Sequence, residues 1–292
     1  MKLKRFGVLT ASVAVAALAL SGCSASGGAD DAVKIGVVGA SDPYWETFTE
    51  AAAEEGITVE LVDFADYNQP NPALSEGELD LNQFQHIVYL ADYNVASGDD
   101  LEPLGSTAIY PLAVFSEKYD DVSKIPAGGE IAIPNDESNR ARALLVLQQA
   151  GLLELEGGGN IFSTPDDIIA DSSKVTVTEV DASFTASSIQ DVDAAVVNND
   201  FVTKAGLNFA DAIFQDDPED ENALPYVNIF AVRAEDRDNE TYLKLVEIYQ
   251  TNDAVQAGVL ENSGGSAVLL QTPVSELVAS LERVQEDIKS NG

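Results

Sequence analysis

The stretch VKIGVVGASDPYWETFTEAAAEEG, residues 33–56, joins an unbroken aliphatic run to the signals of a helix. The run VKIGVVGA is typical of a parallel strand that is buried on both faces. Asp42 is a candidate N-cap, Pro43 suits the first helical position, and Gly56 suits the helix end. The stretch therefore predicts a strand followed directly by a helix, the unit from which α/β domains are built.

The same alternation of strand and helix patterns occurs in two parts of the chain. Two strand-like runs that contain proline, at 102–116 and 224–235, separate these parts, and only helical patterns follow the second run. The pattern predicts two α/β lobes with largely parallel sheets. We place lobe one at 33–110 plus 227–292 and lobe two at 111–226. In such a layout ligands bind in the crevice between the lobes, at the carboxyl ends of strands.

The N-terminus carries the pattern of an exported lipoprotein. Three cations precede the apolar run Phe6–Leu20, which is shorter than the ~20 residues needed to span a bilayer. We therefore expect residues 1–22 to be a signal peptide. The tetrapeptide LSGC resembles a lipobox, which implies a lipid on Cys23 and a flexible tether over 23–32. Cys23 is the only cysteine, so the alternative is an incidental residue of a cleaved signal.

Composition argues against several classes of function. The chain has 15 Lys and Arg against 50 Asp and Glu, a formal net charge of −35, which disfavours nucleic acid as a partner. With one histidine and one cysteine, a zinc site would need mostly carboxylates, and no nucleotide loop or nucleophile elbow occurs. We interpret acidic pairs such as Asp99-Asp100 and Asp216-Asp217 as solvated loop charges; calcium ligands are the alternative, but the EF-hand spacing is absent. The sequence therefore predicts a protein without enzymatic activity, metal or cofactor.

Two arginines stand at the start of a predicted helix in the segment NDESNRARALL. Arg140 and Arg142 would lie in its first turns, where the helix dipole disfavours cations, and a nearby anion would resolve that conflict. Residues two apart on a helix point about 200° from each other, so only one of the two can face a cleft. The alternative is that both arginines are exposed in acidic surroundings.

Polar and aromatic residues near predicted strand ends form a second group of candidates. Amide oxygens of asparagines at strand ends can accept hydrogen bonds from an ammonium group, although such asparagines also serve as caps and turn residues. His86 is the only histidine, and the sequence alone leaves open whether it is structural or functional. The nearby aromatic residues are by default core or rim residues. The candidates are Asn139, Asn198, Asn228, His86, Tyr67, Phe84 and Tyr89.

Five separated segments resemble, in order, the NlpA-type lipoproteins, the methionine-binding proteins of bacterial ABC importers. The segments are DYNQPNPALSEGELDLNQFQHIVYL, YPLAVFS, IPNDESNRARALLVLQQAGLL, AVVNNDF and PYVNIF. The resemblance implies a two-lobed periplasmic-binding-protein-like fold of type II, with a ligand cleft between lobes that two crossover segments join.

The resemblance also implies roles for the candidate residues. Arg142, with Asn139, would hold the carboxylate of the ligand, because a guanidinium fork suits a planar acceptor. Asn198 and Asn228 would take its ammonium group. The aromatic residues and His86 would enclose its side chain, so His86 is expected to be a pocket wall and hydrogen-bonding group without a catalytic task.

These features together predict a lipid-anchored protein on the extracytoplasmic face of the cell membrane. It would capture L-methionine or a close analogue and pass it to an ABC permease. Alternatives are a binding protein for another small amino acid or a methionine-containing dipeptide, an extracellular enzyme on the same scaffold, and a surface protein acting by protein contact.

Overall fold

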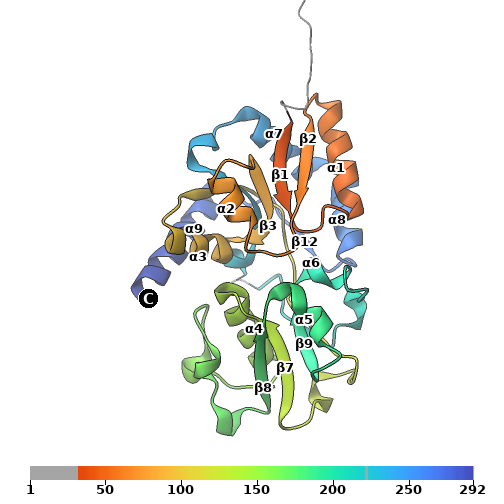
Figure 1. Ribbon diagram of the computed structural model, residues 1–292, viewed down its shortest axis with the longest axis vertical. Coiled ribbons are helices and arrows are strands. Elements are labelled where there is room, and N and C mark those ends of the chain that lie inside the picture. The colour runs from red at the N-terminus through yellow and green to blue at the C-terminus, as the bar shows by residue number, and fades with distance from the viewer. Residues whose placement is uncertain (1–31, 221–222, 292) are drawn as a thin grey trace, which may run out of the picture. The chain divides into compact units, whose positions relative to one another are not determined.

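The computed structural model describes residues 32–220 and 223–291 (Figure 1). The predicted signal peptide, the lipid on Cys23 and nearly all of the predicted tether lie outside these residues.

The first sheet is built mainly from the N-terminal third of the chain. It has the strand order β2-β1-β3-β11-β4. β1 pairs in parallel with both β2 and β3, and its Ile35 and Val37 side chains are fully buried, which confirms the predicted buried parallel strand. β11 runs antiparallel to β3 and β4. The strands are β1 (Val33–Val37), β2 (Val59–Asp63), β3 (Leu81–His86), β4 (Leu101–Ser106) and β11 (Asn228–Arg233).

The second sheet comes from the middle of the chain and has the order β10-β6-β9-β7-β8. β7 pairs in parallel with β8 and β9, whereas β6 runs antiparallel to β9 and β10. The strands are β6 (Ala113–Phe115), β7 (Gly129–Pro134), β8 (Val175–Val180), β9 (Ala194–Val197) and β10 (Phe214–Gln215).

Helices flank both sheets, and we call each sheet with its helices a lobe. Lobe 1 contains the first sheet with α1 (Pro43–Glu54), α2 (Pro70–Ser75), α3 (Ile87–Ser97), α7 (Glu240–Thr251), α8 (Asp253–Asn262) and α9 (Val274–Asn291). Lobe 2 contains the second sheet with α4 (Glu137–Gln149), α5 (Ala182–Ser188) and α6 (Asn199–Val202).

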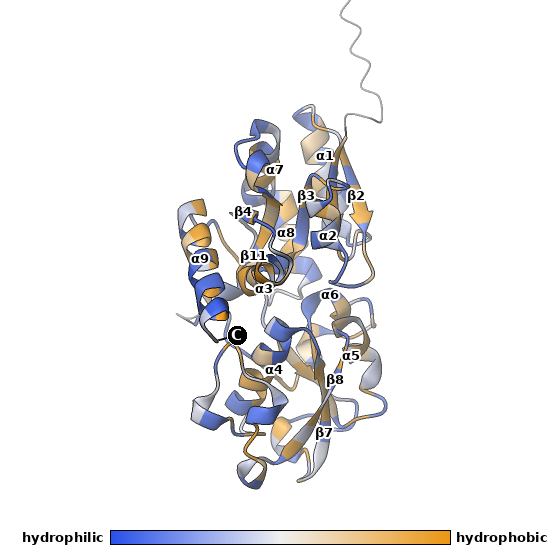
Figure 2. Ribbon diagram, turned by 60° about the vertical axis from the view of Figure 1, so that its left-hand side comes forward, coloured by the Kyte–Doolittle hydropathy of each residue, from blue (hydrophilic) through white to orange (hydrophobic). Residues whose placement is uncertain are grey.

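Helix burial follows the sequence pattern. In α1, Asp42 occupies the N-cap position and Pro43 the first turn as predicted, and Trp45 and Phe48 are buried. In α9, Leu277, Leu281 and Val284 are buried at helical spacing, while the rest of the helix is largely polar (Figure 2). α3 has no such start signal and was not predicted, because His86 takes the N-cap position.

The chain passes between the lobes twice. It leaves lobe 1 after β4 and enters lobe 2 at β6, and it returns between β10 and β11. On the way out it forms β5 (Ala108–Ile109), which pairs with β12 (Val268–Leu269). The first passage falls within the predicted segment 102–116, whereas the second overlaps the predicted segment 224–235 only at its end. The division into 33–110 plus 227–292 and 111–226 remains our proposal for the boundaries.

One hydrophobic cluster contains residues of both lobes. Tyr67 and Phe84 of lobe 1 belong to the same buried cluster as Phe115, Val197 and Phe201 of lobe 2. This shared cluster lies beside the residues that the resemblance marked as a site.

Candidate functional site

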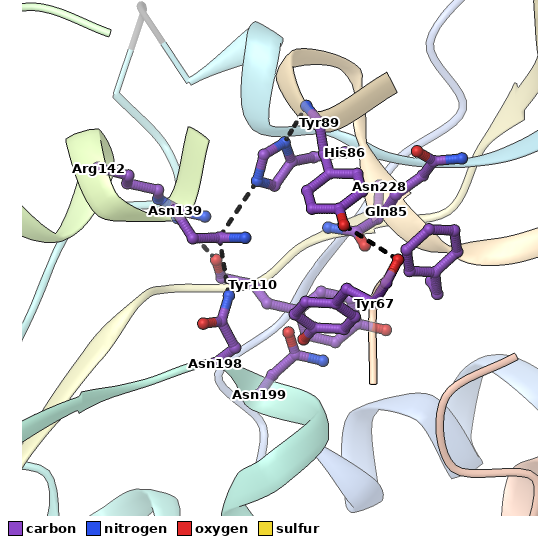
Figure 3. A pocket seen from close by; sticks show the side chains of 11 residues that line it. Tyr67, Gln85, His86, Tyr89, Tyr110, Asn139, Arg142, Asn198, Asn199 and Asn228 are labelled. Carbon is purple, nitrogen blue, oxygen red and sulfur yellow. Dashed lines mark hydrogen bonds between the residues drawn. The ribbon is translucent and has the colours of Figure 1, made fainter. Parts of the chain in front are cut away.

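A pocket lies where residues of both lobes meet, and it contains about 330 Å³ of empty space, part of it open to solvent (Figure 3). All eight predicted ligand-binding residues line it. Three lining residues were not predicted: Gln85, Tyr110 and Asn199. Their roles toward a ligand remain predictions.

The pocket is built from the ends of strands. β3 ends at His86, β9 ends just before Asn198, and β7 leads into α4, which carries Asn139 and Arg142. β11 starts at Asn228, which lies opposite His86 on the adjacent antiparallel strand β3. Polar side chains from four strands therefore converge, as expected for a ligand site in an open α/β sheet.

Arg142 is buried, so the alternative that both arginines are exposed is wrong. Its Nε donates to Asp216 Oδ2 at 2.8 Å, and its Nη2 donates to Asp216 Oδ1 at 3.2 Å and to the Tyr110 carbonyl at 2.9 Å. The guanidinium carbon lies 4.5 Å from the centroid of the Tyr226 ring. Arg140, by contrast, forms an ion pair with Glu179 at 3.2 Å.

Asp216 is the anion that compensates a cation near the start of α4. Its carboxylate also accepts from the Leu112 backbone N–H at 2.8 Å, and it is largely buried. The interpretation of Asp216 as a solvated loop charge was therefore wrong, whereas its neighbour Asp217 is exposed. No local sequence pattern indicates this pair, because Asp216 and Arg142 are 74 residues apart.

This ion pair determines which part of Arg142 can meet a ligand. The Nε and Nη2 edge of the guanidinium is occupied by Asp216 and Tyr110. Within residues 32–220 and 223–291, no protein group accepts a hydrogen bond from Nη1. A ligand carboxylate would therefore meet the Nη1 end of the guanidinium and not the fork that Asp216 occupies.

Asn139 connects the two lobes. Its Oδ1 accepts from Asn198 Nδ2 at 2.8 Å and lies 3.3 Å from His86 Nε2. Its Nδ2 and its backbone N–H both donate to Asp136 Oδ1 at 2.9 Å, so Asp136 caps α4 and orients the Asn139 amide. Burial raises the pKa of Asp136, while these hydrogen bonds oppose the increase.

His86 has a defined protonation state. Its Nδ1 accepts from the Tyr89 backbone N–H at 3.1 Å and caps α3, so the proton lies on Nε2 and is donated to Asn139 Oδ1. Burial, and then the charge of Arg142, lower the pKa of His86 to about 3. The ring is therefore neutral at physiological pH.

Asn198 presents an unsatisfied acceptor. Its Oδ1 is buried and, among the residues that the structure describes, has no hydrogen-bond partner. Such an orphaned acceptor costs about 1–3 kcal/mol, and a donor from a ligand would remove that cost.

Three aromatic side chains form one wall of the pocket. The ring centroids lie 5.8 Å apart for Tyr67 and Phe84, 5.6 Å for Phe84 and Tyr89, and 6.0 Å for Tyr67 and Tyr89. Tyr89 Oη donates to the Tyr67 carbonyl at 3.0 Å. Burial raises the pKa of both tyrosines, which keeps their hydroxyls protonated.

Two further kinds of feature are absent from the part of the chain that the structure describes. No group of three or more histidine, cysteine, aspartate or glutamate side chains there could hold a metal ion. None of the described helices is both long and apolar enough to cross a membrane.

The two α/β lobes, with a polar pocket between them at strand ends, define a periplasmic-binding-protein-like fold. The chain belongs to the NlpA lipoprotein family, whose model matches residues 33–269.

The relatives and solved structures support this assignment over most of the chain. The chain is 36% identical over 265 residues to the probable D-methionine-binding lipoprotein MetQ of Haemophilus influenzae, covering 88% of this chain and 95% of the relative. It is similar to the substrate-binding protein of a methionine transporter from Streptococcus pneumoniae, with a TM-score of 0.76 and 37% identity. The match covers 82% of this chain and 95% of the other. It is also similar to a nutrient-binding protein from Burkholderia cenocepacia that was solved bound to methionine. The TM-score is 0.74 and the identity is 35%, and the match covers 81% of this chain and 99% of the other.

Proposed function

We propose that this protein is a lipid-anchored, extracytoplasmic solute-binding protein that captures methionine for an ABC importer. The observation that carries the proposal is the pairing, in one pocket, of a buried guanidinium and a buried amide oxygen. Among the residues that the structure describes, Nη1 of the guanidinium donates to no protein group and the amide oxygen has no donor. A free amino acid supplies both complements, a carboxylate for Arg142 and an ammonium group for Asn198. The names of the relatives support methionine as that amino acid.

The aromatic wall suits the side chain of methionine. A thioether gains about 0.3–1.5 kcal/mol from each contact with an aromatic edge, and its flexible chain adapts to irregular space. Tyr67, Phe84 and Tyr89 supply such edges on one side of the pocket. A polar side chain of similar length would lose its hydration there without gaining a matched partner.

The anchor and the partner complete the proposal. A lipid on Cys23 would hold the protein at the extracytoplasmic face of the cell membrane, where an ABC permease takes over the ligand. The naming of the family and its relatives as lipoproteins and transporter components supports this part.

Calorimetric titration of protein stripped of bound ligand tests the proposal. We expect L-methionine to bind, with alanine at least about 100-fold weaker, because alanine leaves the aromatic wall uncovered. D-methionine and a methionine-containing dipeptide are the informative competitors. Tighter binding of D-methionine would assign the opposite stereochemistry, and tighter binding of the dipeptide would replace the proposal with its alternative.

Native mass spectrometry of the freshly purified protein is an independent check. A co-purified mass that fits methionine supports the proposal. Failure of methionine to bind to correctly folded, stripped protein would contradict it.

A further inference from the structure

Tyr67 is held from the opposite lobe. Its Oη donates to Asp200 Oδ2 at 2.7 Å, and its ring centroid lies 5.1 Å from that of Phe201. Both partners belong to α6, which directly follows Asn198. The short segment 198–201 therefore contains the unsatisfied acceptor of the pocket, Asn198 Oδ1, and also contacts Tyr67 of the aromatic wall.

The loop after β2 makes a second, weaker contact of the same kind. Asn68 Nδ2 donates to Asp181 Oδ2 at 3.2 Å in an exposed position. Tyr67 itself is buried and tied to α3 by the hydrogen bond from Tyr89. Since Tyr67 and Asp200 are on different lobes, separation of the lobes would break their hydrogen bond.

We propose that Asp200 is a positioning residue for ligand binding, because it holds the Tyr67 hydroxyl across the cleft and so couples the aromatic wall of the pocket to closure of the lobes. The inference rests on the proposed function. It assigns a task to an acidic residue that does not line the pocket.

The surroundings of Asp200 make this contact dependent on pH. The residue is partly exposed, but protein atoms surround its carboxylate, and burial raises its pKa to about 7. The hydrogen bond from Tyr67 and the charge of Lys204 oppose this increase, whereas Asp42 adds to it. The other neighbours within electrostatic reach are tyrosines: Tyr44, Tyr110 and Tyr249.

The direction of the pH effect follows from linkage. Separation of the lobes would hydrate the carboxylate and lower its pKa toward the ordinary value, so closure takes up a proton between the two pKa values. Ligand affinity should therefore fall as the pH rises toward and through about 7. His86, with a pKa of about 3, does not contribute in that range. Asp92, with a pKa raised to about 7 by burial and by Glu137, does contribute, so a variant of Asp200 is needed for comparison.

The experiment is calorimetric titration of stripped protein with L-methionine. We expect Tyr67→Phe and Asp200→Ala each to weaken binding about tenfold, because the part-buried hydrogen bond between the two lobes is lost. The double variant should bind within about twofold of either single variant, since both remove the same contact. Asp200→Asn keeps an acceptor oxygen and should restore affinity to within about threefold of the parent at about pH 8.

Two controls separate positioning from a general loss of structure. Asn68→Ala removes the exposed contact on the neighbouring residue and should change affinity by less than about twofold. Between about pH 5.5 and pH 8, the affinity of the parent should fall at least about threefold more than that of Asp200→Asn, because only the parent can ionise at this position. Tyr67→Phe removes one oxygen atom, so it remains a valid test if Asp200→Ala fails to fold.

The outcomes distinguish this inference from the proposed function. If the parent binds methionine and both Tyr67→Phe and Asp200→Ala bind equally well, or if the double variant is additive, the inference is wrong and the function stands. If the stripped parent does not bind methionine, both are overturned.

Discussion

Arg142 contacts two different kinds of partner. It forms an ion pair with Asp216, and its guanidinium lies over the ring of Tyr226. We expect Arg142→Ala to weaken L-methionine binding at least about 30-fold, or about 2 kcal/mol, because a desolvated carboxylate would lose its charged donor. Arg142→Lys should restore only part of the affinity, since it keeps the charge and loses the planar donor group. Calorimetric titration measures both.

Arg140 provides the matched control on the same helix. Its guanidinium pairs with Glu179 and does not line the pocket. Arg140→Ala should therefore leave the affinity within about twofold of the parent. The opposite order of effects would show that the wrong arginine has been assigned to the carboxylate.

The protonation of His86 can be measured directly, because the chain has one histidine. With a folded-state pKa of about 3, its imidazole NMR shifts should stay constant from about pH 5 to pH 8. The unfolded chain has the higher pKa, about 6.5, so this group stabilises the fold above that pH, and the contribution is lost as the pH falls toward the folded value. A titration midpoint near 6.5 in the folded protein would contradict the buried, neutral ring.

The eight residues were candidates from the sequence pattern, each with a structural alternative, and the family resemblance supplied their expected roles; all eight line the pocket. The missed residues show the limit of local patterns. Gln85 lies in β3, all of whose residues are buried, so strand alternation could not mark it. Asp200 and Asp216 gain their roles from partners far away in sequence, Tyr67 and Arg142 respectively.

At the scale of elements, α1 and α8 pack closely where Gly258 meets Tyr44. A Cβ atom at Gly258 would lie 2.8 Å from Tyr44 Cβ and 3.3 Å from its Cα. Gly258→Ala gains about 1 kcal/mol of helix propensity, but overpacking typically costs about 1–3 kcal/mol, so we expect a net loss of stability. Chemical denaturation measures it, with Ala257→Gly at an exposed position of the same helix as the control for propensity alone.

The direction of the change decides this prediction. A Gly258→Ala protein more stable than the parent would show that the two helices can separate by a few tenths of an ångström at little cost. A loss of stability with unchanged methionine affinity would confine the role of Gly258 to packing.

Elements with standard boundary residues could be predicted, and those without could not. α1 begins with the sequence Asp-Pro and ends before a glycine, so its limits were clear. α3 follows β3 without an intervening turn, and its N-cap is His86, an uncommon residue at that position, so periodicity alone did not reveal it. The mixed strand directions in both sheets were also missed, because β6 and β11 are buried, largely apolar runs that could equally form parallel strands.

At the scale of the whole molecule, the proposed lipid anchor predicts where the protein is found in the cell. Cys23→Ser should release it from membranes or leave its precursor uncleaved, because a thioether-linked lipid cannot form on serine. Membrane fractionation with immunoblotting is the measurement. Unchanged attachment and processing would contradict the role of Cys23.

Contacts from both lobes around one pocket predict stabilisation by ligand. Methionine at about 100 times its Kd should add about 2.7 kcal/mol to the free energy of unfolding and raise the Tm of stripped protein. Glutamate at the same concentration is the control, since its side chain would carry a charge into the aromatic wall. Equal shifts with both amino acids would argue against selection by that wall.

The position of β11 between β3 and β4 constrains how the chain would assemble during the export that we propose. A chain that emerges from a secretion channel N-terminus first presents β1 to β4 long before residues 228–233 are available to join them. The strands of lobe 2, residues 113–215, have all emerged by then and need no later segment for their own pairing. The sheet of lobe 1 is therefore the first to begin forming and the last to be completed. Until β11 is available, β3 and β4 must not pair with other strands. The unpaired edges of β3 and β4 would therefore be the surface that a chaperone outside the membrane binds.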